Sequence, residues 1–146
     1  MFRIIKYSQE YRDDMLYCYL SAKDALGGIP RLRDDLFDIQ KYYFDNEDMF
    51  WIAINEHNRV VGMIGTATVS ETDLWLKRLF IKPEMKRKGI ACSLLNIVIA
   101  YAKSKGITQV HTRFNDDYIE ASHFYPSQGF IENGRSDGLR HFIKKI

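Results

Sequence analysis

Hydrophobic positions recur every three to four residues in the first third of the chain, which is the period of an amphipathic helix. This pattern predicts a helix over residues 8–26, for which Ser8 is the candidate N-cap, and a second helix over 33–44. The cluster Gly27-Gly28-Ile29-Pro30 separates the two helices, because glycine and proline interrupt helical structure. A short strand over 3–7 is predicted to precede them.

The period changes after residue 50, where β-branched and aromatic residues dominate and turn clusters divide them. These runs predict an antiparallel meander of strands over 50–55, 59–69 and 73–82. Apolar residues at i, i+4 spacing then predict a helix over 89–105, which Gly106 ends. The residues of this apolar face are Ile90, Leu94, Val98 and Ala102. The remaining predicted elements are a strand over 107–114, a helix over 119–128, and strands over 130–133 and 139–146.

The predicted element order is βααβββαβαββ, which indicates an α+β fold. Because helices join the later strands, at least one connection must be a crossover, and we expect a mixed sheet rather than a purely antiparallel one. No linker rich in Pro, Ser or Gly, no repeat and no long like-charge block divides the 146 residues. We therefore expect a single domain over residues 1–146.

The composition excludes several classes of protein. Hydrophobic residues make up 46% of the chain and aromatic residues 14%, which is too apolar for a disordered chain. The net charge of +2 argues against a nucleic-acid binder that is cationic throughout. The longest apolar stretch, 97–102, is far shorter than a membrane span, and the N-terminus lacks the apolar core of a signal peptide. Cys18 and Cys92 lack the spacing of metal ligands, so we expect reduced thiols and no metal. Together with the missing membrane span and signal peptide, this predicts a soluble, cytoplasmic protein.

Positive charge is concentrated in the segment 77–88, which contains one Glu and the cations Lys77, Arg78, Lys82, Lys86, Arg87 and Lys88. Gly89 follows directly and opens a predicted helix. The first turn of a helix has about four N–H groups without partners and carries roughly half a positive charge. The segment therefore predicts an anion cradle for phosphate-type groups, with a solvated basic turn as the alternative. The nucleotide motifs GxxxxGK[ST] and GxGxxG are absent.

A second motif lies in the next predicted helix, where Ala121 precedes Phe124-Tyr125 and Gly129-Phe130 follows. Taken alone, these aromatic residues would be assigned to the core. Taken in order, the two segments resemble the GNAT superfamily of acyl-CoA-dependent N-acyltransferases. Its signature is (Q/R)xxGx(G/A) at a helix start, followed by an AxxFYxxxGF-type helix and strand. The first motif here is Lys86-Arg87-Lys88-Gly89-Ile90-Ala91. The resemblance implies a twisted, mostly antiparallel central sheet flanked by helices.

The resemblance also implies that acetyl-CoA is the cosubstrate, and it gives roles to particular residues. The CoA pyrophosphate would be held by Lys86 and by the backbone amides of the six residues that follow it, which are Arg87, Lys88, Gly89, Ile90, Ala91 and Cys92. A strand backbone would pair with the pantetheine arm, and its residues are Leu79, Phe80 and Ile81. Tyr125 would protonate the departing thiolate, because a hydroxyl with a pKa of about 10 stays protonated at neutral pH.

Several residues depart from the family pattern. Lys86 stands where the family prefers Gln or Arg, and Tyr118 stands where many members have Asn. Lys77 lies near the place of a proton-relaying Glu in some members, so the general base is unassigned. His111 is one candidate for it, with a structural role as the alternative. Pro126 disfavours helical geometry at the residue before it, which predicts a kink beside Tyr125.

The leading hypothesis is an N-acetyltransferase that moves an acetyl group to a primary amine by direct attack in a ternary complex. A small amine or an amino acid is the favoured acceptor. Segment 27–44 is expected to border the acceptor site, where Asp34, Asp35 and Asp38 either attract a cationic amine or form a solvated helix face. The alternatives are a protein N-terminal or lysine acetyltransferase, a non-catalytic CoA-binding sensor, and a nucleic-acid binder that uses segment 77–88. We expect no nucleic-acid or membrane partner, and a homodimer is compatible with the sequence.

Overall fold

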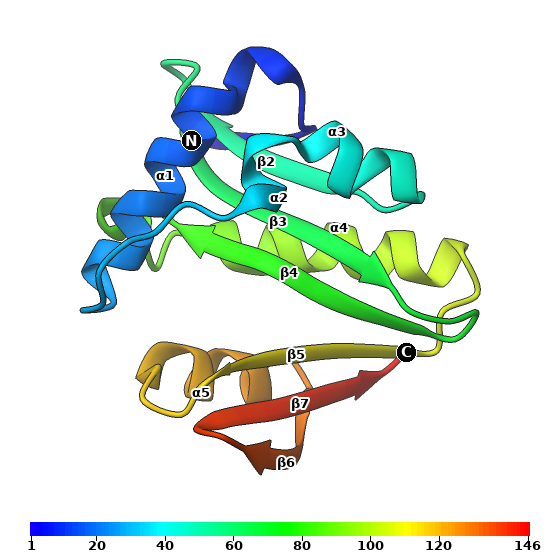
Figure 1. Cartoon of the computed structure of the whole chain (residues 1–146). Coiled ribbons are helices and arrows are strands. Elements are labelled where there is room, and N and C mark those ends of the chain that lie inside the picture. The colour runs from blue at the N-terminus through cyan, green and yellow to red at the C-terminus, as the bar shows by residue number, and fades with distance from the viewer.

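Seven strands form one twisted sheet in the computed structural model, which describes residues 1–146 (Figure 1). The order across the sheet is β1-β2-β3-β4-β5-β7-β6, so the last strand of the chain lies inside the sheet and β6 forms an edge. Neighbouring strands are antiparallel except β4 and β5, which are parallel. The strands are β1 (Phe2–Lys6), β2 (Phe50–Asn55), β3 (Val60–Thr68), β4 (Asp73–Ile81), β5 (Gln109–Asn115), β6 (Ile131–Ser136) and β7 (Leu139–Lys145).

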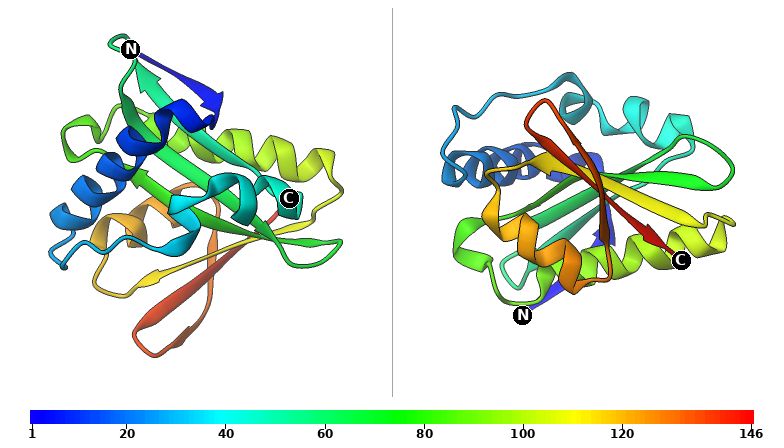
Figure 2. Two further views of the ribbon diagram at one scale, coloured as in Figure 1. Left: turned by 45° about the horizontal axis from the view of Figure 1, so that its top comes forward. Right: turned by 90° about the horizontal axis from the view of Figure 1, so that it is seen from below.

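Helices cover both faces of this sheet (Figure 2). Those named α1, α2 and α3 lie on one face, and α4 and α5 lie on the other. Successive residues of β2 point to opposite faces, so Ile52 packs in the core under α1 and Ala53 packs in the core under α4. The helices are α1 (Arg12–Ala25), α2 (Asp34–Phe37), α3 (Ile39–Tyr42), α4 (Ile90–Ser104) and α5 (Ile119–Ser127), with 3-10 turns η1 (Gln9–Tyr11), η2 (Phe44–Asn46) and η3 (Pro83–Met85).

The predicted α+β architecture is confirmed, including the mixed sheet and the order of strands and major helices. The apolar face predicted for α4 is also confirmed, because Ile90, Leu94, Val98 and Ala102 are all buried against the sheet. Gly106 follows this helix with a φ of 81°, in the left-handed region that favours glycine.

Two predicted helices differ from the structure. Residues 9–11 form a 3-10 turn, and α1 begins only at Arg12. Ser8 does not cap it, because its hydroxyl donates to the Glu10 carboxylate instead. The single helix predicted over 33–44 is also wrong. Asp38 leaves helical geometry, with a φ of −145°, and its carboxylate accepts the Lys41 amide at the start of α3.

The two parallel strands at the centre of the sheet separate along their length. β4 and β5 pair only over three positions, from Asp73↔Gln109 to Trp75↔His111. Beyond this point β4 pairs with β3 alone. Between the two β4 residues that pair with Met63 and Gly65, β4 has one residue more than β3. Arg78 lies at this bulge with a φ of 58°. The edge of β4 that faces β5 is therefore free of a strand partner from residue 76 onward.

Candidate active site

The loop before α4 presents a row of free backbone donors. Six consecutive amides, from Arg87 to Cys92, make no hydrogen bond to the rest of the chain. The next amide, that of Ser93, bonds to the Gly89 carbonyl and begins the helical ladder. Arg87 and Gly89 have φ values of 63° and 83°, which turn the loop sharply into the helix. This segment therefore has the geometry of an anion cradle, as the sequence predicted.

The cations around the cradle have different partners. The Lys86 ammonium lies 3.0 Å from the Glu120 carboxylate of α5, so it bridges the two sides of the opening between β4 and β5. Arg87 and Lys88 are exposed and form no ion pair. Two of the three cations of the motif are thus free for an anionic ligand, and the third is paired with Glu120.

The predicted pantetheine-binding segment, Leu79 to Ile81, lies on the free edge of β4. Its backbone connects the bulge at Arg78 with the loop that leads to the cradle. Phe80 and Ile81 pair with β3 on one side, and no strand pairs with them on the other. An extended ligand arm can therefore add to β4 as an extra strand.

Tyr125 lies deep in α5, between the helix and β5. Its ring stacks on Phe114 at a centroid distance of 5.5 Å and contacts Phe124 and Phe130 edge-on. Burial raises the pKa of the Tyr125 hydroxyl to about 12, against the smaller opposing effect of its hydrogen bond with Thr112. The phenol is therefore protonated throughout the neutral range and can act as a proton donor.

The proline that the sequence predicts to disturb the helix beside Tyr125 does not interrupt it. The helix continues through Pro126 and ends at Ser127, where the Gln128 amide bonds to the Phe124 and Tyr125 carbonyls. Pro126 is tolerated because it lies in the last turn, where a missing N–H removes only one bond of a short ladder.

A family model described as "Acetyltransferase (GNAT) family" matches residues 9–130. The chain belongs to this family. Human N-acetyltransferase 8 is 34% identical over 108 residues, which are 70% of this chain and 47% of that protein. N-acetylaspartate synthetase of Xenopus tropicalis is 28% identical over 133 residues, 86% of this chain and 49% of that protein. The chain spans about half the length of the curated relatives it matches.

Solved structures agree with this assignment. A GNAT acetyltransferase from Staphylococcus aureus Mu50 superimposes with a TM-score of 0.90 at 29% identity, covering 99% of both chains. The PaiA N-acetyltransferase of Thermoplasma acidophilum, solved in complex with coenzyme A, has the same fold, with a TM-score of 0.81 at 20% identity over 100% of this chain and 99% of that one. The predicted family and fold are confirmed.

Lys23 of α1 lies across the opening between β4 and β5, because its ammonium contacts a residue of β4 and a residue that follows β5. Its ammonium lies 3.0 Å from the hydroxyl of Tyr118, the residue that replaces a common family Asn. The same ammonium lies above the ring of Phe80, at 5.9 Å from the centroid. Lys23 and Tyr118 are 95 positions apart, and no sequence motif connects them.

Asp35, which sequence analysis placed at the acceptor site, is engaged by two neighbours. The Arg78 guanidinium binds it with two hydrogen bonds, of 2.6 and 3.0 Å, and the Tyr43 hydroxyl donates to it at 2.7 Å. Burial raises the pKa of Asp35, but the hydrogen bonds from Arg78 and Tyr43 outweigh it, so the pKa is lowered overall. Asp38 caps α3 with one carboxylate oxygen, and neither Asp34 nor Asp38 forms an ion pair, so both exposed carboxylates keep their negative charge.

Replacing Asp35 with asparagine is expected to lower the free energy of unfolding by about 1–2 kcal/mol at pH 7, because it leaves the half-buried Arg78 guanidinium without a counter-charge. The lowered pKa means that Asp35 stabilises the fold above pH 4 or so and that this contribution is lost as the pH falls through its folded-state value. Urea unfolding at pH 7 and at pH 3 measures both effects. Asp34→Asn is the matched control and should change neither.

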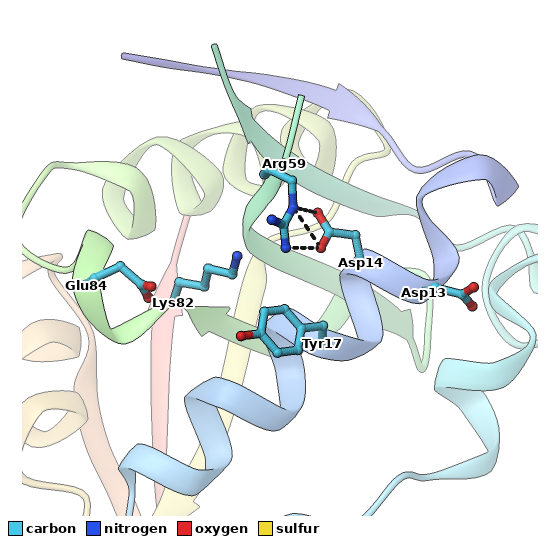
Figure 3. Close-up of a pocket in the computed structure, with 6 residues that line it drawn as sticks. All are labelled: Asp13, Asp14, Tyr17, Arg59, Lys82 and Glu84. Atoms are coloured by element: carbon cyan, nitrogen blue, oxygen red, sulfur yellow. Dashed lines mark hydrogen bonds and ion pairs between the residues drawn. The ribbon is translucent and has the colours of Figure 1, made fainter. Parts of the chain in front are cut away.

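The polar pocket in Figure 3 lies on the α1 side of the sheet. Its lining residues are Asp13, Asp14, Tyr17, Arg59, Lys82 and Glu84. The Asp14 carboxylate lies 2.8 Å from the Arg59 guanidinium and accepts the Val60 amide at 2.7 Å, so it fastens α1 to β3. None of the residues predicted to bind acetyl-CoA lines this pocket.

No group of three or more His, Cys, Asp or Glu side chains is placed to hold a metal ion. None of the helices combines the length and the hydropathy required to cross a bilayer.

Proposed function

We propose that residues 1–146 form a single N-acetyltransferase domain that moves an acetyl group from acetyl-CoA to a primary amine by direct attack in a ternary complex. The observation that carries this proposal is the row of six free amides, Arg87 to Cys92, beside the free edge of β4. Family membership supports acetyl-CoA as the donor.

In this proposal the cradle binds the pyrophosphate of acetyl-CoA. Amides from Arg87 to Cys92 donate to its oxygens, and the free cations Arg87 and Lys88 supply positive charge. The pantetheine arm pairs with the backbone of Leu79, Phe80 and Ile81. Lys86 acts from a distance, because its ion pair with Glu120 holds α5 and Tyr125 beside the opening.

Negative charge develops at two atoms during the reaction, first on the carbonyl oxygen and then on the sulfur. Attack of the amine nitrogen on the thioester carbon places negative charge on the carbonyl oxygen, and a backbone N–H of β4 near the bulge can donate to that oxygen. Collapse of this intermediate breaks the carbon–sulfur bond and expels the thiolate. Tyr125 is the proposed proton donor to that sulfur, since its hydroxyl is protonated at neutral pH.

The charges at the opening favour an acceptor that carries a carboxylate. Lys23, Lys77 and Arg113 form no ion pair with a carboxylate, and strand alternation puts Lys77 and Arg113 on the face of the sheet that α1 covers. On the same side, the negative charge of Asp35 is neutralised by Arg78. One relative, N-acetylaspartate synthetase, is named for a product whose amine precursor is a dicarboxylic amino acid. We therefore favour an amino acid as the acceptor.

The test is a free-thiol assay with acetyl-CoA and four acceptors: L-aspartate, phenethylamine, spermidine, and a peptide with a free N-terminus and one lysine. We expect thiol release above background, with L-aspartate ahead of spermidine and the peptide. Calorimetry with CoA measures cofactor binding separately. CoA binding without release from any acceptor would indicate a sensor, and absence of both would contradict the proposal.

A further inference from the structure

Three side chains from three strands form a continuous hydrogen-bonded chain. The Asp73 carboxylate at the start of β4 lies 2.6 Å from Nε2 of His111 on β5. Nδ1 of His111 lies 2.9 Å from Nε2 of His141 on β7. The remaining ring nitrogen of His141, Nδ1, forms no hydrogen bond within the protein. The chain therefore ends in one free imidazole nitrogen.

The chemistry of these groups fixes the proton positions. An ionised carboxylate can only accept, so Nε2 of His111 carries the proton that points to Asp73. In the neutral ring Nδ1 of His111 then has a lone pair, and Nε2 of His141 must donate to it. Nδ1 of neutral His141 is consequently left with a lone pair. Asp73 thus orients His141, through His111, as a proton acceptor.

This series of hydrogen-bonded side chains lies where β4 and β5 begin to separate. Trp75↔His111 is the last paired position of the two strands. Because the cradle lies beyond the other end of β4, a cofactor arm that follows the free edge from Ile81 reaches the bulge at Arg78 over three residues, or about 10 Å. The thioester at the end of this arm is therefore directed toward the end of the free edge, where Trp75 and His111 pair.

The two histidines lie on the face of the sheet opposite to Tyr125. Strand alternation puts Val110, Thr112 and Phe114 on the α5 side, where Phe114 stacks on Tyr125, and puts His111 on the other side. On β7, Phe142 stacks on Phe114 in the core under α5, so its neighbour His141 faces away from α5. A thioester held between the strands would have the phenol on one face and the imidazole pair on the other.

The surroundings keep His141 uncharged. Burial first, and then repulsion from His111 when that ring is protonated and from Arg113, lower the pKa of His141 below its ordinary value. The other charged group in the cluster is Asp73, which lies beyond His111, and on β6 the residue opposite His141 is Gly134. Trp75 stacks on both imidazole rings, with centroid distances of 5.0 Å, and holds them in one orientation. His141 is therefore a fixed, neutral base at pH 7.

We propose that Nδ1 of His141 accepts the proton of the acceptor amine during acetyl transfer, with His111 and Asp73 as positioning residues. This inference rests on the proposed acetyltransferase function. As the nitrogen–carbon bond forms, one proton passes from nitrogen to Nδ1 of His141. The proton on its Nε2 can then shift to His111, where the positive charge lies beside Asp73. The thiolate gains one proton and the amine loses one, so the transfer is balanced.

The test compares His141→Phe with wild type, using acetyl-CoA and the acceptor that gives the highest rate in the four-compound assay. The phenyl ring preserves the stack on Trp75 and removes both nitrogens. We expect kcat to fall about 10- to 100-fold with an unchanged KM for acetyl-CoA. In wild type, activity should fall at acidic pH as His141 becomes protonated, and this acidic limb should be missing in the variant.

Further measurements separate this role from a structural one. His57→Gln, in the exposed β2–β3 turn, is the control and should behave as wild type. Asp73→Asn should lower kcat less than His141→Phe and shift the acidic limb. Wild-type profiles with two acceptors of different basicity need no variant, and an acidic limb that moves only with the acceptor would overturn the proposal. So would full activity of His141→Phe, whereas absence of turnover in wild type would contradict the acetyltransferase function itself.

Discussion

Replacing Tyr125 with phenylalanine is expected to lower kcat about 100- to 1,000-fold, because the thiolate must then leave without a proton donor. The substitution removes one oxygen atom from a ring that stays packed between Phe114, Phe124 and Phe130. We expect the KM for acetyl-CoA and the Kd for CoA to change less than threefold or so, since the hydroxyl is needed only as the sulfur leaves.

The control for this variant is Tyr101→Phe. Tyr101 lies on the surface of α4, and its hydroxyl donates to the Glu47 carbonyl. The control should leave kcat unchanged. The free energy of unfolding of Tyr125→Phe should fall by no more than about 1 kcal/mol, because the substitution removes one hydroxyl and leaves the packed ring in place. Equal kcat in wild type and Tyr125→Phe would remove Tyr125 from the role of acid. Because the pKa of Tyr125 is raised to about 12, no alkaline loss of activity should arise from its ionisation below about pH 11.

Replacing Gly89 with valine is expected to weaken CoA binding about 100-fold. A β-branched residue is strongly disfavoured at the φ of 83° that Gly89 adopts, so the loop must change shape. That change moves the free amides of the cradle out of alignment, and each charge-assisted hydrogen bond to the pyrophosphate contributes roughly 1.5–3 kcal/mol. Isothermal titration with CoA measures the loss.

Gly106→Val supplies a matched control at the other end of the same helix. Gly106 has nearly the same φ, 81°, and a Cβ at either position would meet no atom within 4 Å. Both variants should therefore lose a similar 1–2 kcal/mol or so of stability from backbone strain. Only Gly89→Val should lose CoA affinity. If both variants bind CoA as tightly as wild type, the amides Arg87 to Cys92 are not the pyrophosphate site.

The sequence predicted the parts of this site that depend on local order. The cradle needs only a basic loop, a glycine and the first turn of α4, all of which lie within a dozen residues. The two motifs then identified the family before any tertiary contact was known, and the family model confirmed it. Local rules failed at the N-terminal helices, where Asp38 caps a new helix instead of continuing the preceding one, and at Pro126, where α5 continues through the proline.

The sequence by itself determined the order of elements, the cradle at Gly89 and the family of this protein, because these follow from periodicity and from neighbours along the chain. Only the tertiary structure brought together Arg78 with Asp35, and Asp73 with His111 and His141. The second group requires β7 to lie between β5 and β6, a strand order that no local pattern contains. From the sequence, His111 was a candidate general base with no known partner. In the structure both of its ring nitrogens are hydrogen-bonded, and the free imidazole nitrogen belongs to His141.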